Sequence, residues 1–119
     1  MIRPKVYTLR LSWPDSRLAS NARVHWRPKA AATKAARHEA WAIAKTRQLP
    51  KWPEARLTFT FYPPDRRRRD MQNMPGMMKA YIDGIADAMG CDDNKFRCVW
   101  PEAFGDVVQG GSVRVEVSE

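Results

Sequence analysis

The residues of this sequence that are best able to do chemistry lie between Asp65 and Asp93. Four consecutive arginines run directly into Asp70, and the acidic pair Asp92 and Asp93 closes the segment. Arginines attract anions, whereas carboxylates attract cations. A divalent metal and a phosphodiester satisfy both demands together, because arginines bind backbone phosphates while carboxylates hold a metal that activates water. The segment therefore predicts metal-dependent chemistry on a phosphodiester.

The composition of the chain favours a polyanionic partner. The 119 residues carry a formal charge of +8, and 44% of them are apolar, which is enough for one small domain with a core. A basic surface kept for solubility is the alternative explanation of the charge. No apolar run is long enough to span a bilayer, and the charge-split N-terminus does not resemble a secretory signal, so we expect no membrane association and a cytoplasmic location. Cys91 and Cys98 lack a metal-binding spacing and are interpreted as reduced thiols.

The elements that must position these residues follow from the hydrophobic pattern. Alternating residues predict strands at about 6–11, 57–62, 96–100 and 113–117. Helical spacing and proline in a first turn predict helices at 28–47 and 74–89. Two helices interleaved with about four strands indicate a single α+β domain over residues 1–119, with a mixed sheet.

Residues 15–27 have no clear period, and we interpret them as a basic loop. Arg23 and Arg27 are candidate DNA contacts, and Trp26 between them suits stacking on a base or sugar. A loop that anchors Trp26 in the core is the alternative.

The ordered set of residues from Arg68 to Phe96 resembles the RusA family of Holliday junction resolvases. The pattern is carried by an RRD followed by Asn, a lysine, a DG pair and a DD turn before an aromatic. The matching residues are Arg68, Arg69, Asp70, Asn73, Lys79, Asp83, Gly84, Asp92, Asp93 and Phe96. LSWP at 11–14 and NARVHW at 21–26 also resemble phage members of that family, so the resemblance covers nearly the whole chain.

The resemblance implies a homodimeric, Mg²⁺-dependent endodeoxyribonuclease that resolves four-way DNA junctions with paired symmetric nicks. Such an enzyme serves DNA recombination and repair. Asp70 and Asp93 would be metal ligands, and Lys79 a catalytic cation near the scissile phosphate. The arginine run would contact the DNA backbone through Arg66, Arg67, Arg68 and Arg69.

Gln72 departs from the family pattern, which has an aspartate at this position. A Gln oxygen can coordinate Mg²⁺ but brings no negative charge, so metal would be held more weakly unless Asp92 compensates. Two outcomes stay open: a weakened nuclease, or a junction-binding protein that no longer cuts. A general basic nucleic-acid-binding module is a third interpretation. In that case Asp70 caps a helix and Asp93 fills a turn.

The length of the second predicted helix favours a dimer. About 16 residues span ~24 Å, and Asp70 and Asp93 flank opposite ends, so we expect their loops not to meet within one chain. Two copies of the helix packed antiparallel around a two-fold axis would bring each Asp70 to the partner's carboxylate. The helix's apolar stripe would be the interface. It consists of Met74, Met78, Tyr81, Ile82, Ile85 and Met89.

Overall fold

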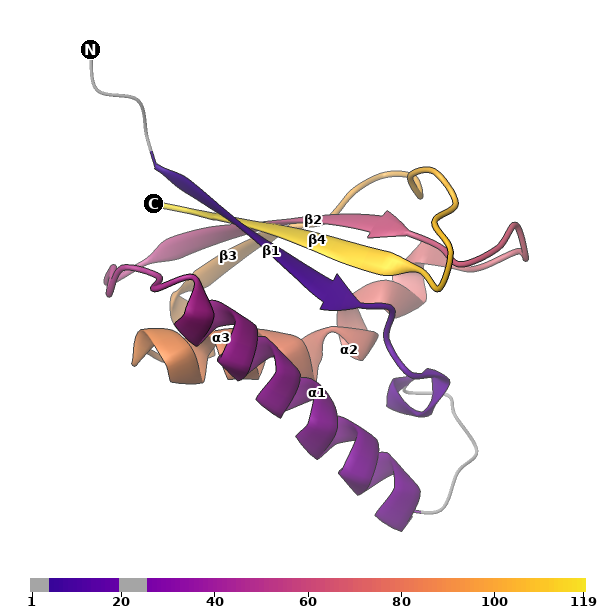
Figure 1. Cartoon of the computed structure of the whole chain (residues 1–119), viewed down its shortest axis with the longest axis horizontal. Helices are drawn as coiled ribbons and strands as arrows, with labels where there is room; N and C mark the ends of the chain where they lie inside the picture. Colours follow the sequence, from indigo (N-terminus) through magenta and orange to yellow (C-terminus); the bar gives the residue numbers. More distant parts are fainter. Residues whose placement is uncertain (1–4, 20–25) are drawn as a thin grey trace.

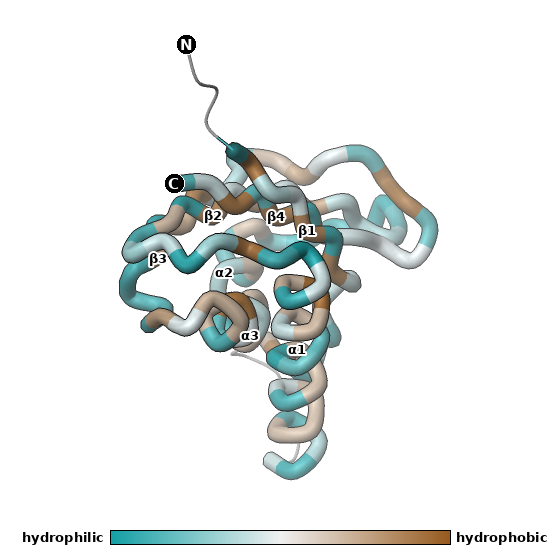
Figure 2. Tube along the Cα trace, turned by 60° about the vertical axis from the view of Figure 1, so that its left-hand side comes forward, coloured by the Kyte–Doolittle hydropathy of each residue, from teal (hydrophilic) through white to brown (hydrophobic). Residues whose placement is uncertain are grey.

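A computed structural model of the chain describes residues 5–19 and 26–119. Its elements follow one another as β1 (Val6–Ser12), a 3-10 turn η1 (Ser16–Leu18), α1 (Trp26–Thr46), β2 (Ala55–Tyr62), η2 (Met71–Asn73), α2 (Met74–Met77), α3 (Lys79–Met89), η3 (Asp93–Lys95), β3 (Phe96–Val99) and β4 (Ser112–Ser118). The predicted α+β class with a four-stranded mixed sheet is confirmed. The helices lie on one side of the sheet, and α1 projects beyond it (Figures 1 and 2).

The sheet has the strand order β1-β4-β2-β3. β4 pairs antiparallel with β1 on one side and β2 on the other, whereas β2 and β3 are parallel. A parallel pair needs a crossover connection, and the segment containing α2 and α3 provides it. The residues between Asp65 and Asp93 therefore all lie in the crossover between two neighbouring strands.

Alternation along the strands divides the sheet into a buried and an open face. The side chains that point toward the helices are buried: Leu9, Leu11, Leu57, Phe59, Phe61, Val113, Val115 and Val117. The intervening residues are polar or charged and face away from the helices. One covered face and one solvated face are the usual condition of antiparallel pairs.

The second predicted helix is interrupted. Its first turn is α2, and the longer α3 begins at Lys79 after Met78, whose φ of −90° and ψ of −6° depart from helical geometry. Pro75 lies in the first turn of α2, as predicted. The first helix begins at Trp26, which places Arg27 in its first turn rather than in the predicted loop.

The apolar stripe of the second helix belongs to the core of the protomer. Met78 and Ile85 are fully buried at 0% exposure, and the other four stripe residues are at most 7% exposed within a single chain. A residue already covered by its own chain has no surface left for a partner. The expectation that this stripe forms the interface of an antiparallel dimer is therefore wrong.

Gly84 lets α1 and α3 approach closely. A Cβ built on Gly84 would collide with the carbonyl oxygen of Arg37 and lie 2.9 Å from Cβ of Ala40. The buried face of α1 consists of small residues, Ala32, Ala36, Ala40 and Ala44. The absence of a side chain at Gly84 therefore sets the distance between the two helices.

The exposed edge of β1 is partly covered by side chains from α1. Glu39 accepts a hydrogen bond from the backbone N–H of Ser12 at 2.8 Å, and Arg47 donates one to the carbonyl of Thr8 at 2.9 Å. These bonds satisfy edge groups that would otherwise be available to another strand. In the described part of the chain, no helix is both long enough and apolar enough to cross a bilayer.

Candidate functional site

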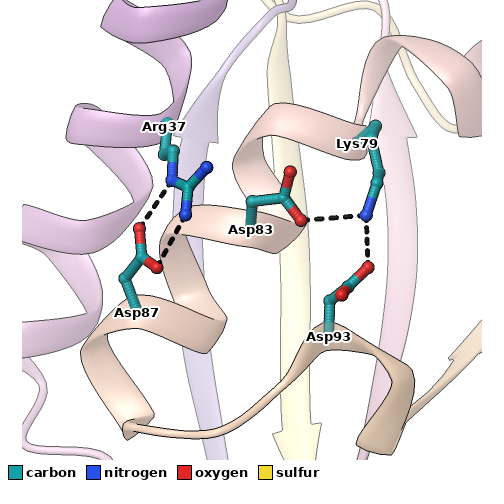
Figure 3. Close-up of polar contacts among 5 residues, drawn as sticks. All are labelled: Arg37, Lys79, Asp83, Asp87 and Asp93. Atoms are coloured by element: carbon teal, nitrogen blue, oxygen red, sulfur yellow. Dashed lines mark hydrogen bonds and ion pairs between the residues drawn. The ribbon is translucent and has the colours of Figure 1, made fainter.

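An acid–lysine cluster, defined as Lys79, Asp83 and Asp93, lies at the beginning of α3 (Figure 3). The ammonium of Lys79 contacts Asp83 Oδ1 at 2.9 Å, one helical turn away, and also forms a short ion pair with Asp93. Lys79 and Asp83 thus form an i,i+4 ion pair on the surface of α3. Two carboxylates thus converge on one cation, and the sequence had placed two of these three residues in a candidate site.

Asp93 reaches Lys79 because the chain reverses at the end of α3. Gly90 adopts a left-handed conformation with φ of 71°, and the N–H of Cys91 bonds to the carbonyl of Ala86. This is the geometry of a glycine C-cap. The following residues run back beside the helix to η3. The segment after the helix thus returns beside it and brings Asp93 to Lys79. The prediction that Asp70 and Asp93 do not meet within one chain stays a prediction.

The ion pairs fix the charge states of the cluster. Hydrogen bonding to Lys79 is the main cause that lowers the pKa of the Asp93 carboxyl below its usual range. Conversely, Asp93 first and Asp83 second raise the pKa of the Lys79 ammonium. Both groups are charged at neutral pH.

A second ion pair lies beside the cluster. Arg37 of α1 binds Asp87 of α3 through two nitrogens, with distances of 2.6 and 2.9 Å (Figure 3). Asp87 is the main cause that raises the pKa of Arg37, and Asp83 and Asp93 contribute in the same direction. Arg37 is therefore within electrostatic reach of the cluster.

The arginine loop, defined as residues 65–69, is held by its own contacts. Asp65 accepts hydrogen bonds from the backbone N–H of Arg67 and from the guanidinium of Arg69. Arg69 also lies 5.4 Å from the ring of Trp13 and bonds to two backbone carbonyls of the loop. Arg69 therefore shapes the loop, while Arg66, Arg67 and Arg68 are exposed and available to an anion.

Asp70 lies in a cavity of about 510 Å³ next to the arginine loop. The cavity is lined by Trp13, Pro14, Ser16, Pro64, Asp65, Arg67, Arg68, Arg69, Asp70, Asn73, Met74 and Met77. The Asp70 carboxylate caps η2 by accepting a hydrogen bond from the N–H of Gln72 at 3.0 Å. Asp70 is exposed despite this bond, so it remains accessible to a ligand in the cavity.

The remaining predicted residues are dispersed. Gln72 and Asp92 are exposed and have no hydrogen bond from their side chains among the described contacts. Arg27 lies 5.3 Å from the ring of Trp26, which is 67% exposed and so does not anchor the loop in the core. Arg23 lies outside the described residues. Across residues 5–19 and 26–119, no group of three or more His, Cys, Asp or Glu side chains is positioned to hold a metal.

Arg37, Asp87 and Trp13 are neighbours of the site that the sequence analysis did not assign. The repeated four-residue spacing of Lys79, Asp83 and Asp87 places all three on one face of a helix, and this signal was available in the sequence. The contacts of Arg37 and Trp13 depend on tertiary packing, which local spacing does not report.

The comparisons with known proteins find a similar protein whose name states no activity. No protein family model matches the chain. An uncharacterized protein of Xylella fastidiosa (strain Temecula1 / ATCC 700964) is 41% identical over 97 residues. The alignment covers 77% of this chain but 63% of that protein, so the chain spans less than two thirds of its relative. This similarity assigns no activity to the chain.

Proposed function

We propose that the protein is a Mg²⁺-dependent endodeoxyribonuclease that acts on four-way DNA junctions. The observation that carries the proposal is the convergence of Lys79 and Asp93, two residues that the RusA resemblance assigns to catalysis. Their ion pair brings together positions fourteen residues apart in sequence. The exposed arginines and the charge of +8 support a polyanionic substrate.

The donor set of the cluster suits Mg²⁺ in part. Mg²⁺ is commonly bound by one or two carboxylates while it retains several waters, and Asp83 and Asp93 already converge on a cation. Asp93, which the sequence predicted as a ligand, and Asp83, which it did not, would hold the ion. Asp70, Gln72 and Asp92 are the other ligands predicted from the sequence, and the described structure does not bring them into this cluster. A bound Mg²⁺ would lower the pKa of a water and offset phosphate charge.

The protein side chains have separate roles in this proposal. Lys79 offsets the negative charge that develops on the phosphate in the transition state. Asp93 is deprotonated at neutral pH, as an ordinary aspartate is, and its ion pair with Lys79 lowers its pKa further. Arg66, Arg67 and Arg68 bind the DNA backbone beside Asp70. A two-fold dimer remains part of the proposal because paired nicks need two active sites, but its interface is not the buried stripe of α3.

A cleavage assay on a fluorescent four-way junction tests the proposal. Wild-type protein with Mg²⁺ should give nicked product that EDTA abolishes. Asp93→Asn and Asp70→Asn should each reduce the rate at least 100-fold, roughly 3 kcal/mol in the barrier. Asp106→Asn, which removes an exposed carboxylate in the 100–111 loop, is the matched control and should cut normally.

A non-cutting junction-binding protein is the second candidate. It is favoured by Gln72 and by the absence, among the described residues, of a group of three metal-binding side chains. It predicts metal-independent, junction-selective binding that Asp70→Asn leaves unchanged or tightens. Gln72→Asp separates the candidates, because it should speed cleavage by an enzyme. If neither wild type nor this variant nicks a junction with Mg²⁺, the nuclease proposal is refuted.

A further inference from the structure

The open face of the sheet places arginines directly opposite one another on neighbouring strands. The register pairs Arg10 of β1 with Arg114 of β4, and Arg56 of β2 with Arg97 of β3. All four side chains point away from the helices, because the residues that flank them are the buried ones. These two pairs define what we call the arginine face.

Like charges directly opposite on neighbouring strands destabilise a sheet, because their Cβ atoms lie about 4.5–5.5 Å apart. Arg114 is offset in part by Glu116, 3.6 Å away, and it lies over the ring of Tyr62. Among the described residues, Arg10, Arg56 and Arg97 have no hydrogen bond or ion pair from their side chains. Arg10, Arg56 and Arg97 therefore keep exposed charges without an ion pair, whereas Glu116 offsets Arg114. The positive charge that remains favours an anion that binds from outside the chain.

The surroundings of the arginine face suit an extended anion. Thr8, Glu116 and Thr58 form the row of paired residues between the two arginine pairs, and Thr60 lies opposite Arg114, so the face carries hydroxyl groups and one carboxylate. No helix of the described residues covers this side (Figure 1). At the Arg56 end the face continues into a hollow of about 440 Å³. This hollow is lined by Pro53, Glu54, Ala55, Arg56, Lys95, Arg97 and Glu119, so its acids limit but do not cancel the positive charge.

We propose that the arginine face binds the phosphodiester backbone of a nucleic acid, separately from the acid–lysine cluster. The two opposed pairs are four residues apart along β4, about 13 Å at 3.3–3.4 Å per residue, so a single small anion cannot reach both. A polymer with regularly spaced phosphates can. The choice of nucleic acid as that polymer rests on the proposed function, and the face would hold a DNA arm away from the cutting centre.

The test removes one arginine from each opposed pair. Arg10→Gln with Arg97→Gln keeps a polar side chain while deleting two charges. Lys45→Gln with Lys51→Gln deletes two charges from exposed positions elsewhere. Binding of a four-way junction and of a linear duplex is measured in EDTA over a range of salt concentrations. At 0.1 M salt each phosphate contact is worth about 8-fold in affinity, so the arginine double variant should bind about 60-fold more weakly, with a salt slope smaller by about 2. The lysine pair should change affinity less than 3-fold.

Thermal unfolding at low salt separates a binding role of these arginines from a role in stabilising the fold. Because it relieves both repulsions, the arginine double variant should melt at or above the wild-type temperature. The inference is overturned if the two double variants bind DNA equally, or if the arginine double variant melts at a lower temperature than wild type. It is also overturned if wild type binds vesicles of anionic phospholipid more tightly than DNA. Loss of a dimer in the arginine variant would also overturn it. Cleavage by wild type is measured in a separate assay. A protein that does not cut can therefore be told apart from a protein whose arginine face does not bind DNA.

Discussion

The contact between α1 and α3 makes Gly84→Ala the sharpest test of the fold that supports the site. The added Cβ would lie 2.9 Å from Cβ of Ala40 and 3.0 Å from the backbone nitrogen of Trp41. Ordinary carbon–carbon contacts lie at about 3.5–4.0 Å, so relief of the Ala40 contact alone requires the two helices to separate by about 0.6–1.1 Å, and relief of the closer Arg37 contact requires more. The nearest obstacle is the backbone carbonyl of Arg37, which cannot rotate away.

The expected magnitude is the balance of two effects. Overpacking of a core costs about 1–3 kcal/mol, while alanine in place of glycine in a helix gains about 1 kcal/mol. Because the obstacle is backbone, we expect the upper part of the overpacking range and a net loss of about 1–2 kcal/mol. For a chain of this size the melting temperature should fall by roughly 4–10 °C.

Gly76→Ala is the matched control, because a Cβ at Gly76 meets no heavy atom within 4 Å. This variant should melt at the wild-type temperature or slightly above it. Calorimetry or circular dichroism measures both proteins. If Gly84→Ala is as stable as Gly76→Ala, the close approach of the two helices is wrong, and the placement of Arg37 beside the acid–lysine cluster loses its support.

Three further outcomes follow from the contacts described. Lys79→Met should melt below wild type across the neutral range, and its difference from wild type should shrink only below about pH 4 and above about pH 10 in thermal melts. The reason is that the lowered pKa of Asp93 stabilises the fold only above its unfolded value of about 3.9, and the raised pKa of Lys79 only below about 10.4. Asp65→Ala removes the carboxylate that holds the arginine loop, so trypsin should cut there faster than in wild type; an equal rate would contradict the role of that carboxylate. Burial raises the pKa of Cys91 and Cys98, so both thiols should react slowly with iodoacetamide at pH 7 and quickly in denaturant, and rapid labelling of the folded protein would argue against their packing.

Much of the fold was predictable because strand alternation and helix period report which side of an element is apolar. β4 was predicted almost to its ends, and β2 differed only in beginning at Ala55. The same pattern does not report what covers an apolar side. Met78 and Ile85 fit a dimer interface as well as a core, and only the position of the sheet and α1 decides for the core.

The candidate site was predictable residue by residue but not in its arrangement. The sequence singled out Lys79 and Asp93, yet the helix length suggested that acids at its two ends stay apart. The return of Asp93 to Lys79 depends on Gly90, because a glycine after a helix commonly caps it in a left-handed conformation and reverses the chain. The opposed arginines of the open face depend on strand register, which long-range pairing determines.

The position of β4 inside the sheet constrains how the protein can form during synthesis. Residues 112–118 provide hydrogen-bonding partners for β1 and β2 at once, so those two strands have no neighbour in common until this late segment leaves the ribosome. Long sequence separation between paired strands slows folding. A nascent chain that lacks this strand would hold α1 and α3 without a complete sheet to cover their apolar sides. Such a chain would depend on rapid pairing of β4 to avoid aggregation.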